Sequence, residues 1–288
     1  MTKLQTVLGL MSGTSLDGID VAAIETDGAN TIRALGQLYV PYDDEARSLL
    51  QAALEAAQNA QATVWRAPDT WPEPVRRANL LVSEAHIEAI ARFRAAHDVV
   101  FTLVGFHGQT VLHQPEAGIT IQIGDPQAVA RATDCAVVGQ FRLADIANGG
   151  QGAPLAPLFH AARAKSQSGT LGVLNIGGVA NITLLGEGGK ICAFDTGPGN
   201  AMIDDWVSAK TGRAYDADGA LARRGRVDEL ALQRLLSHAF FDQAPPKSLD
   251  RLAFDPSPVA ALSSEDGAAT LTAFTAAAVA RGLEICGF

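Results

Sequence analysis

One short segment, residues 9–20, limits what this chain can fold into more than any other. It reads G-L-M-S-G-T-S-L-D-G-I-D, and an apolar run enters it while a second apolar run, residues 19–24, leaves it. Two apolar runs joined by a turn rich in glycine and hydroxyl residues are typical of two strands and a tight turn. We therefore expect residues 4–25 to form a strand, a turn and a second strand.

The turn between these strands combines hydrogen-bond donors with acids. Gly13 and Gly18 allow backbone N–H groups to approach an anion closely, and hydroxyls such as that of Ser12 add donors. The carboxylates of Asp17 and Asp20 would repel a phosphate unless a divalent cation lay between them. The composition suits a metal–nucleotide phosphate, and it equally suits an ordinary polar hairpin turn.

The same layout returns in the second half of the chain. Residues 171–176, 179–185 and 191–194 are apolar runs separated by glycine turns, like the runs within residues 7–40. Such an internal repeat indicates two similar α/β lobes. We expect a nucleotide to lie between the turns of the two lobes.

Between the repeats, helical periodicity begins at Asp43 and returns over residues 75–96. Residues 99–104 are continuously apolar, which predicts a buried strand that ends in the polar turn G-F-H-G-Q-T. Polar residues at the end of such a strand are where ligands bind in open α/β sheets. His107 in this turn either orients a ligand or caps the turn.

Three further charged residues stand in glycine- or proline-rich surroundings. Arg142 either holds a ligand oxygen or forms a salt bridge with Asp145 at a hinge. Asp195 ends an apolar run before a Gly-Pro-Gly turn, so it suits a general base at a cleft or a cap of the turn. Lys247, in the stiff segment P-P-K-S, is expected to attract an anion.

Composition excludes several classes of partner. The 288 residues carry a net charge of −9 without a long basic run, which argues against nucleic acid or an anionic membrane. We identify no signal peptide and no apolar stretch long enough to span a membrane. Cys135, Cys192 and Cys286 lie far apart in apolar contexts, as expected of buried thiols in a reducing, cytoplasmic compartment.

Seven segments in order resemble the anhydro-N-acetylmuramic acid kinase family. They are G-L-M-S-G-T-S-L-D-G-I-D (9–20), H-G-Q-T with His113 and Pro115, Q-I-G-D-P (122–126), G-G-Q-G-A-P-L (149–155), N-I-G-G-V-A-N-I-T (175–183), F-D-T-G-P-G-N (194–200) and P-P-K-S (245–248). The resemblance implies duplicated actin/hexokinase-like (ribonuclease H-like) lobes, here residues 1–140 and 141–288, with a nucleotide cleft between them. Family members continue beyond the last strand, expected here at residues 283–286, so the second lobe is expected to be C-terminally incomplete.

The family resemblance also implies a reaction and roles for residues. ATP would phosphorylate O6 of 1,6-anhydro-N-acetylmuramic acid while water opens the anhydro bridge, with Asp195 as the base. Arg142 and His107 would contact the sugar, and Asp17 would lie nearest Mg²⁺. The ATP-binding turn would comprise Gly13, Thr14, Ser15, Leu16, Asp17, Gly18, Ile19 and Asp20.

Family resemblance implies a homodimer as well. Two other functions stay open at this point: a catalytically inactive sugar- or nucleotide-binding relative, and an actin-like ATPase that moves partners. Departures from the family pattern bear on the choice. Gln140 stands where the family usually has Asp, and Leu249-Asp250-Arg251 stands where it usually has T-G-R.

Overall fold

The computed structural model describes residues 3–13, 15–29, 31–165 and 167–286. The chain divides into two compact units. Unit 1 comprises Met1–Gly152 and Ala162–Lys165, and unit 2 comprises Ala153–Ala161 and Ser166–Phe288. The lobe boundaries expected from the sequence, 1–140 and 141–288, stay a prediction, because they concern ancestry and function rather than compactness.

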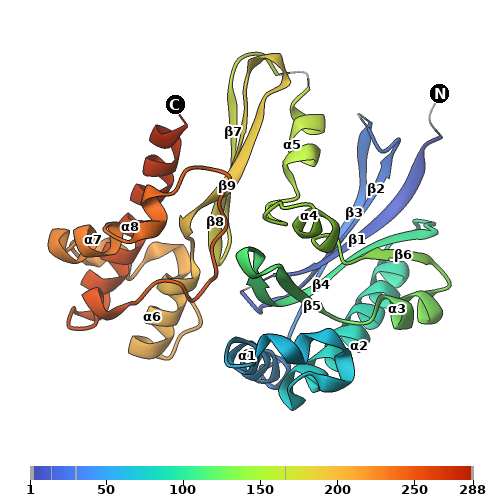
Figure 1. Ribbon diagram of the computed structural model, residues 1–288, viewed down its shortest axis with the longest axis horizontal. Coiled ribbons are helices and arrows are strands. Elements are labelled where there is room, and N and C mark those ends of the chain that lie inside the picture. Colours follow the sequence, from blue (N-terminus) through green and yellow to red (C-terminus); the bar gives the residue numbers. More distant parts are fainter. Residues whose placement is uncertain (1–2, 14, 30, 166, 287–288) are drawn as a thin grey trace. The chain divides into compact units, whose positions relative to one another are not determined.

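Unit 1 is built on a mixed sheet, sheet A (Figure 1). Its strands follow the order β3-β2-β1-β4-β5, and β6 pairs with β4. β1 pairs antiparallel with β2 and parallel with β4, and β2 pairs antiparallel with β3. The strands are β1 (Gln5–Ser12), β2 (Gly18–Thr26), β3 (Ile32–Pro41), β4 (Leu103–Gln114), β5 (Ile119–Ile123) and β6 (Ala136–Gly139). The strand–turn–strand–strand meander expected at the N-terminus is confirmed.

Helices cover one face of sheet A (Figure 1). α1 (Asp44–Gln58) and α2 (Glu73–Ala96) pack on each other, and α3 (Pro126–Thr133) packs on α2. Leu50 of α1 and Phe93 of α2 are fully buried in one apolar core with Leu8 of β1. The short helix α4 is Leu143–Ala147, and single 3₁₀ turns are Ala62–Arg66, Pro68–Thr70 and Pro115–Ala117.

The strand expected at residues 99–104 is wrong in its bounds. β4 begins at Leu103 and continues to Gln114, so the G-F-H-G-Q-T segment lies inside the strand and not in a turn after it. Gly108, at φ 67°, misled the sequence interpretation because it supplies a bulge rather than a turn. Beyond this bulge Gln109 of β4 still pairs with Ser12 of β1, and β4 pairs antiparallel with β5 from that residue onward.

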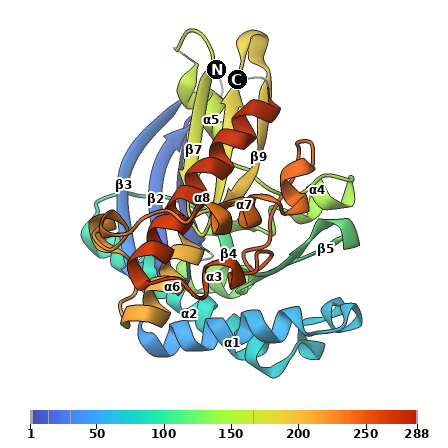
Figure 2. The ribbon, with the colours of Figure 1, turned by 90° about the vertical axis from the view of Figure 1, so that its left-hand side faces the viewer.

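Unit 2 repeats the simple meander. Sheet B has the order β7-β8-β9, with β7 (Leu171–Ile176), β8 (Val179–Leu185) and β9 (Ile191–Pro198) antiparallel throughout. α8 (Ser264–Ile285) packs along β8 and β9 (Figure 2). The other helices are α5 (Pro157–Ala164), α6 (Ala201–Thr211) and α7 (Glu229–Leu236), with 3₁₀ turns at Glu187–Gly189, Ala217–Gly219, Ala222–Arg224, Ala239–Asp242 and Ser257–Val259.

The final strand expected at residues 283–286 is also wrong. These residues are the last turn of α8, and Cys286 is its C-cap. Gly282 lies inside this helix, where α8 approaches β9 closely. A Cβ at this glycine would come within 3.0 Å of Thr196 and 3.2 Å of Phe194. Leu283 and Cys286, three residues apart, therefore share the helix face that packs on sheet B.

No helix within the described residues is long and apolar enough to cross a bilayer. The expectation of three buried thiols is met by Cys135 alone. The three cysteines are free thiols, of which Cys135 is buried and the other two are half-buried. The Sγ atoms of Cys192 and Cys286 lie 3.8 Å apart, although the sequence separates them widely.

Candidate functional site

Leu16 ties the turn after β1 to the core of unit 1. Its side chain is 4% exposed and packs in the core of unit 1, which anchors the turn to the sheet. Its N–H donates to the carbonyl of Gly13 at 3.2 Å, closing the turn. Leu16 has φ 56°, a left-handed conformation that is costly for a bulky side chain and that concentrates at functional sites.

The predicted nucleotide-binding residues fall into two groups in the structure. Gly13 and Ser15 are half-buried, and Asp17 and Asp20 are exposed, so these four are accessible to a ligand. The buried ones are Leu16, Gly18 and Ile19, which can contribute backbone groups but not side chains. Thr14 lies outside the described residues.

Gly18 has a structural reason to be glycine. A Cβ there would come within 2.5 Å of the Val40 carbonyl oxygen and 2.8 Å of the Tyr39 ring. Gly13 differs, because a Cβ at that position would meet nothing closer than the Ser15 hydroxyl at 3.5 Å. The absence of a side chain at Gly13 lets a ligand approach the backbone of this turn.

The accessible side of the turn is acidic. Ser15 donates its hydroxyl to a carboxylate oxygen of Asp17 at 2.6 Å. Burial first, and the neighbouring Asp17 charge second, raise the pKa of Asp20. Burial and the charges of Asp17 and Asp20 also raise the pKa of Tyr39. The two carboxylates therefore share one electrostatic environment in which a cation is favourable.

These two carboxylates fit Mg²⁺ in the way kinases use it. Mg²⁺ usually takes one or two carboxylates, with phosphate oxygens and waters as its other ligands. The described residues hold no group of three or more His, Cys, Asp or Glu residues that would form a dedicated metal cage. The carboxylate of Asp17 is held by the hydroxyl of Ser15.

Sequence reasoning missed a buried hydrogen-bond chain below the turn. Tyr42 donates its hydroxyl to Ser12 Oγ at 3.0 Å, and Ser12 Oγ donates to Gln109 Oε1. Ser12 and Gln109 are 1% and 0% exposed. The expected use of the Ser12 hydroxyl as a phosphate donor is therefore wrong, because its hydrogen is already committed to Gln109. Ser12 stood out in the sequence, but nothing near it indicated either partner.

His107 and Arg142, predicted separately, contact each other in unit 1. Arg142 Nη2 donates to His107 Nε2 at 2.9 Å, and His107 Nδ1 donates to the Gly108 carbonyl at 2.8 Å. Burial and the Arg142 charge lower the pKa of His107 to about 4, so the imidazole is neutral near pH 7. With both ring nitrogens engaged, His107 is placed to orient the Arg142 guanidinium.

The glycine-rich segment after α4 is folded around Arg142 and Asp145. Arg142 Nη1 donates to the carbonyl of Gly152 at 2.7 Å, and the Asp145 carboxylate accepts the N–H of Gly152 at 2.7 Å. A Cβ at Gly150 would come within 2.2 Å of the Asp145 carboxylate. Both charged residues thus shape one loop. Whether Arg142 also contacts a ligand stays a prediction.

Asp195 lies within β9 of unit 2 and is 7% exposed. Its Oδ2 accepts the N–H of Leu249 at 2.8 Å, and its own N–H donates to the Lys247 carbonyl at 3.0 Å. The P-P-K-S segment and the following Leu249 therefore run beside β9, where Lys247 fixes the backbone of Asp195 and Leu249 fixes its carboxylate. This rigid placement is what a general base requires.

Lys247 does not offer its ammonium group to a ligand. It is 4% exposed, and its Nζ donates to the Phe240 carbonyl at 3.0 Å and lies 4.4 Å from the centre of that residue's ring. Burial, followed by the Arg281 charge, lowers its pKa. The expected anion-binding role is wrong, and the side chain instead anchors the segment that holds Asp195.

The turn between β7 and β8 contacts the segment that follows β9, close to Asp195. The N–H of Gly199 donates to the Gly178 carbonyl at 2.9 Å, and the N–H of Asn200 donates to the Gly177 carbonyl at 2.8 Å. A Cβ at Gly199 would come within 2.0 Å of the Gly177 carbonyl oxygen. The turn between β7 and β8 is thus locked against the turn that follows Asp195.

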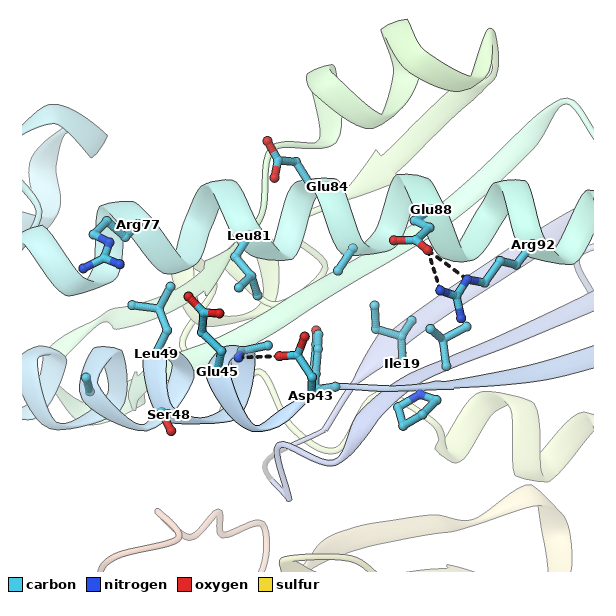
Figure 3. A pocket seen from close by; sticks show the side chains of 16 residues that line it. Ile19, Asp43, Glu45, Ser48, Leu49, Arg77, Leu81, Glu84, Glu88 and Arg92 are labelled. Atoms are coloured by element: carbon cyan, nitrogen blue, oxygen red, sulfur yellow. Dashed lines mark hydrogen bonds and ion pairs between the residues drawn. The ribbon is translucent and has the colours of Figure 1, made fainter.

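Unit 1 also has a groove on its helical side (Figure 3). It has a volume of about 770 Å³ and lies between α1 and α2. Its floor includes Ile19 and Leu81, and carboxylates and arginines such as Glu84 and Arg92 stand around it. Among the described residues, Ile19 is the predicted site residue that lines it, and Tyr42 and Asp43, which follow β3, line it as well.

Comparison with known proteins gives consistent matches. The model of the family described as anhydro-N-acetylmuramic acid kinase matches residues 5–287. A relative of that name from Methylobacterium nodulans is 50% identical over 293 residues, covering 96% of this chain and 77% of the relative. Another, from Acidiphilium cryptum, is 52% identical over 276 residues, covering 95% and 74%.

One solved structure also matches, at a low level. The ethanolamine utilization protein EutJ from Carboxydothermus hydrogenoformans aligns with a TM-score of 0.31 and 12% identity. The alignment covers 77% of this chain and 61% of that one. A similarity at this level carries no argument about either the fold or the site.

Proposed function

Because this chain belongs to the anhydro-N-acetylmuramic acid kinase family, we propose that it opens the anhydro bridge of 1,6-anhydro-N-acetylmuramic acid with water and phosphorylates O6. The product is N-acetylmuramic acid 6-phosphate, formed in recycling of the cell wall. The chain is a kinase by its family, and a kinase of this family uses ATP. The substrate, the product and the residues that act on them are the proposal.

The proposed ATP phosphate site is the turn from Gly13 to Asp20. The absence of a side chain at Gly13, the accessible carboxylates of Asp17 and Asp20, and the anchored backbone at Leu16 support it. Mg²⁺, when bound, would neutralise the phosphate charge during transfer. Asp17 would face that ion, directly or through water.

Asp195 is the proposed general base, and its fixed position in β9 is the observation that carries the mechanism. Its carboxylate takes a proton from water as the water oxygen bonds to C1 of the sugar. The C1–O6 bond breaks, and O6 bonds to the γ-phosphorus while ADP leaves. Holding the base rigidly removes the entropy cost of orienting it at the moment of reaction.

Arg142 is the proposed sugar contact, with His107 as its support. A guanidinium held by the Gly152 carbonyl and a neutral imidazole keeps one orientation, which suits recognition of a carboxylate or a hydroxyl. The lactyl carboxylate of the sugar offers such a partner.

At the level of architecture, we propose that the two meanders belong to duplicated actin/hexokinase-like lobes with the nucleotide between them. Their common layout of strand, glycine turn, strand and strand supports this. We also propose a homodimer and a cytoplasmic location, where ATP is available. A single monomeric peak in sedimentation at micromolar concentration would contradict the dimer.

The test of the proposed function is ADP release by the purified chain with Mg²⁺ and ATP, measured with and without 1,6-anhydro-N-acetylmuramic acid. We expect release that depends on the sugar, with one 6-phosphorylated product per ADP. Binding of the sugar and ATP without ADP release, from a folded chain, would instead identify a non-catalytic binding relative. Release independent of the sugar would favour an ATPase.

A further inference from the structure

A single aromatic residue lies beneath the proposed phosphate turn. Tyr42 directly follows β3 and precedes α1, and it is 8% exposed. β3 is two strands away from β1, so a contact between Tyr42 and β1 must pass across the beginning of β2. The side chain therefore lies where the turn leaves and re-enters sheet A.

Tyr42 is bonded to both ends of this turn. Its hydroxyl donates to Ser12 Oγ at 3.0 Å, and its backbone N–H donates to the Asp17 carbonyl at 2.9 Å. Ser12 is the last residue of β1, and Asp17 directly precedes β2. Tyr42 thus contacts both Ser12 and Asp17, the residues at the two ends of the turn.

The direction of the hydrogen bonds in this chain is fixed. The single hydroxyl hydrogen of Ser12 goes to Gln109 Oε1, so Ser12 can only accept from Tyr42. Gln109 in turn donates Nε2–H to the Thr110 carbonyl at 3.2 Å. Burial raises the pKa of Tyr42 to about 12, so the phenol keeps its hydrogen over the whole range in which the protein is assayed.

Tyr42 is itself held from both sides along the chain. Pro41, the residue before it, pairs with Gly18 at the end of the β2–β3 ladder. Asp43, the residue after it, caps α1 by accepting the N–H of Ala46 at 2.8 Å (Figure 3). A residue fixed between a strand and a capped helix is a rigid support.

We propose that Tyr42 is a positioning residue that holds both ends of the Gly13–Asp17 turn at one separation, so that ATP phosphates bind without rearranging the turn. The inference rests on the proposed function of that turn. Pre-organised backbone donors bind more tightly because the ordering cost is already met in the free protein. Tyr42 itself is buried below the turn and acts through it rather than on the nucleotide.

The test is Tyr42→Phe, which keeps the ring and the backbone bond to Asp17 but loses the bond to Ser12. We expect the dissociation constant of Mg·ATP and the KM for ATP to rise about three- to tenfold, the usual effect of one lost hydrogen bond. We expect kcat and the KM for the sugar to stay the same. Tyr215→Phe is the matched control, because Tyr215 is 61% exposed in unit 2.

A second variant breaks the same bond from the other side. Ser12→Ala should weaken ATP binding as well, and the double variant should be no worse than the poorer single one, since both remove one shared interaction. Amide hydrogen exchange within residues 13–18 should be faster in Tyr42→Phe without any ligand. Amide exchange measures how firmly the turn is held, and it does so independently of catalysis.

Two results would overturn the inference. One is a lower melting temperature of Tyr42→Phe with unchanged ATP affinity, which would make Tyr42 merely structural. The other is strict additivity of the two variants in ATP affinity. The proposed function of the turn is tested separately, and unchanged ATP affinity in Gly13→Val would contradict it. ATP binding that is weakened in Gly13→Val but not in Tyr42→Phe would refute the role of Tyr42 alone.

Discussion

The three-stranded meanders of the two units share a layout but place polar residues differently. In unit 1 the turn between β1 and β2 carries the hydroxyl and carboxylate groups. In unit 2 the corresponding turn, Gly177-Gly178, has no side chains, and the carboxylate lies on the third strand at Asp195. Under the proposed function, one framework would support a binding turn in one unit and a rigidly held base in the other.

The first strands of the meanders also differ in their surroundings. β1 pairs on both sides, with β2 and β4, and Leu8 and Leu10 are 0% and 4% exposed. Among the described residues β7 pairs only with β8, and Leu174 and Ile176 are 43% and 52% exposed. A strand held on both sides is the better support for a turn that must keep its shape when a ligand binds.

The largest expected effect comes from Asp195→Asn in unit 2. Removing a general base should lower kcat by about 10²–10⁴-fold, with ADP release as the measurement. Asp218→Asn is the matched control, because Asp218 is exposed and has a left-handed φ of 57° that Asn tolerates. Unchanged kcat in Asp195→Asn would assign the base to another residue.

The second largest effect is expected from replacing a glycine by alanine, and it should differ between the two meanders. Gly199→Ala places a Cβ within 2.0 Å of the Gly177 carbonyl oxygen, and we expect a loss of about 1–3 kcal/mol in stability. Gly13→Ala places its Cβ 3.5 Å from the Ser15 hydroxyl, an ordinary van der Waals contact, and should leave the melting temperature unchanged. Thermal unfolding of both variants measures these effects on stability. Equal losses of stability would contradict the distinction between the tightly packed turn at Gly199 and the less tightly packed turn at Gly13.

Acid should destabilise unit 1 through two buried histidines. Burial is the main cause that lowers the pKa of His86 and of His107 to about 4 from 6.5. The unfolded chain therefore binds protons first as the pH falls, and stability is lost between pH 6.5 and about 4. His86→Leu should reduce the slope in this window by about 1.4 kcal/mol per pH unit, measured by denaturant unfolding. An unchanged slope would show that His86 takes up a proton in the folded state.

The smallest effect concerns the two carboxylates of the unit 1 turn. Asp17→Asn should raise the Mg²⁺ concentration needed for half-maximal ATP binding by about three- to tenfold, since one favourable charge is lost. It should also lower the pKa of Asp20, which the Asp17 charge raises. Carboxyl titration by NMR checks the second point. An Asp20 pKa that does not move would mean that burial alone causes its shift.

Sequence reasoning located most of the local structure and some of the site. Both meanders, the helix that begins after Asp43 and the position of Asp195 near a strand end followed from hydrophobic periodicity and turn chemistry. The errors arose where a glycine serves close packing instead of chain reversal. Gly108 forms a bulge within β4, and Gly282 lies where α8 approaches β9, but in the sequence both resemble the end of an element.

The supports of the site could not be predicted from local pattern. Tyr42 and Ser12 are 30 residues apart, and Ser12 and Gln109 are 97 apart. The burial of Lys247 likewise depends on Phe240, which only the folded chain brings over its ammonium group. Such contacts follow from tertiary packing, so a single sequence supplies the residues that bind or react but not the residues that hold them.

The most direct test of the division between the meanders is the Mg·ATP dissociation constant of Gly13→Val and Asp195→Asn, measured side by side by calorimetry. We predict weaker binding in Gly13→Val and unchanged binding in Asp195→Asn, although the latter has lost turnover. Unchanged binding in Gly13→Val, or equal weakening in both variants, would contradict the assignment of binding to the first meander and chemistry to the second.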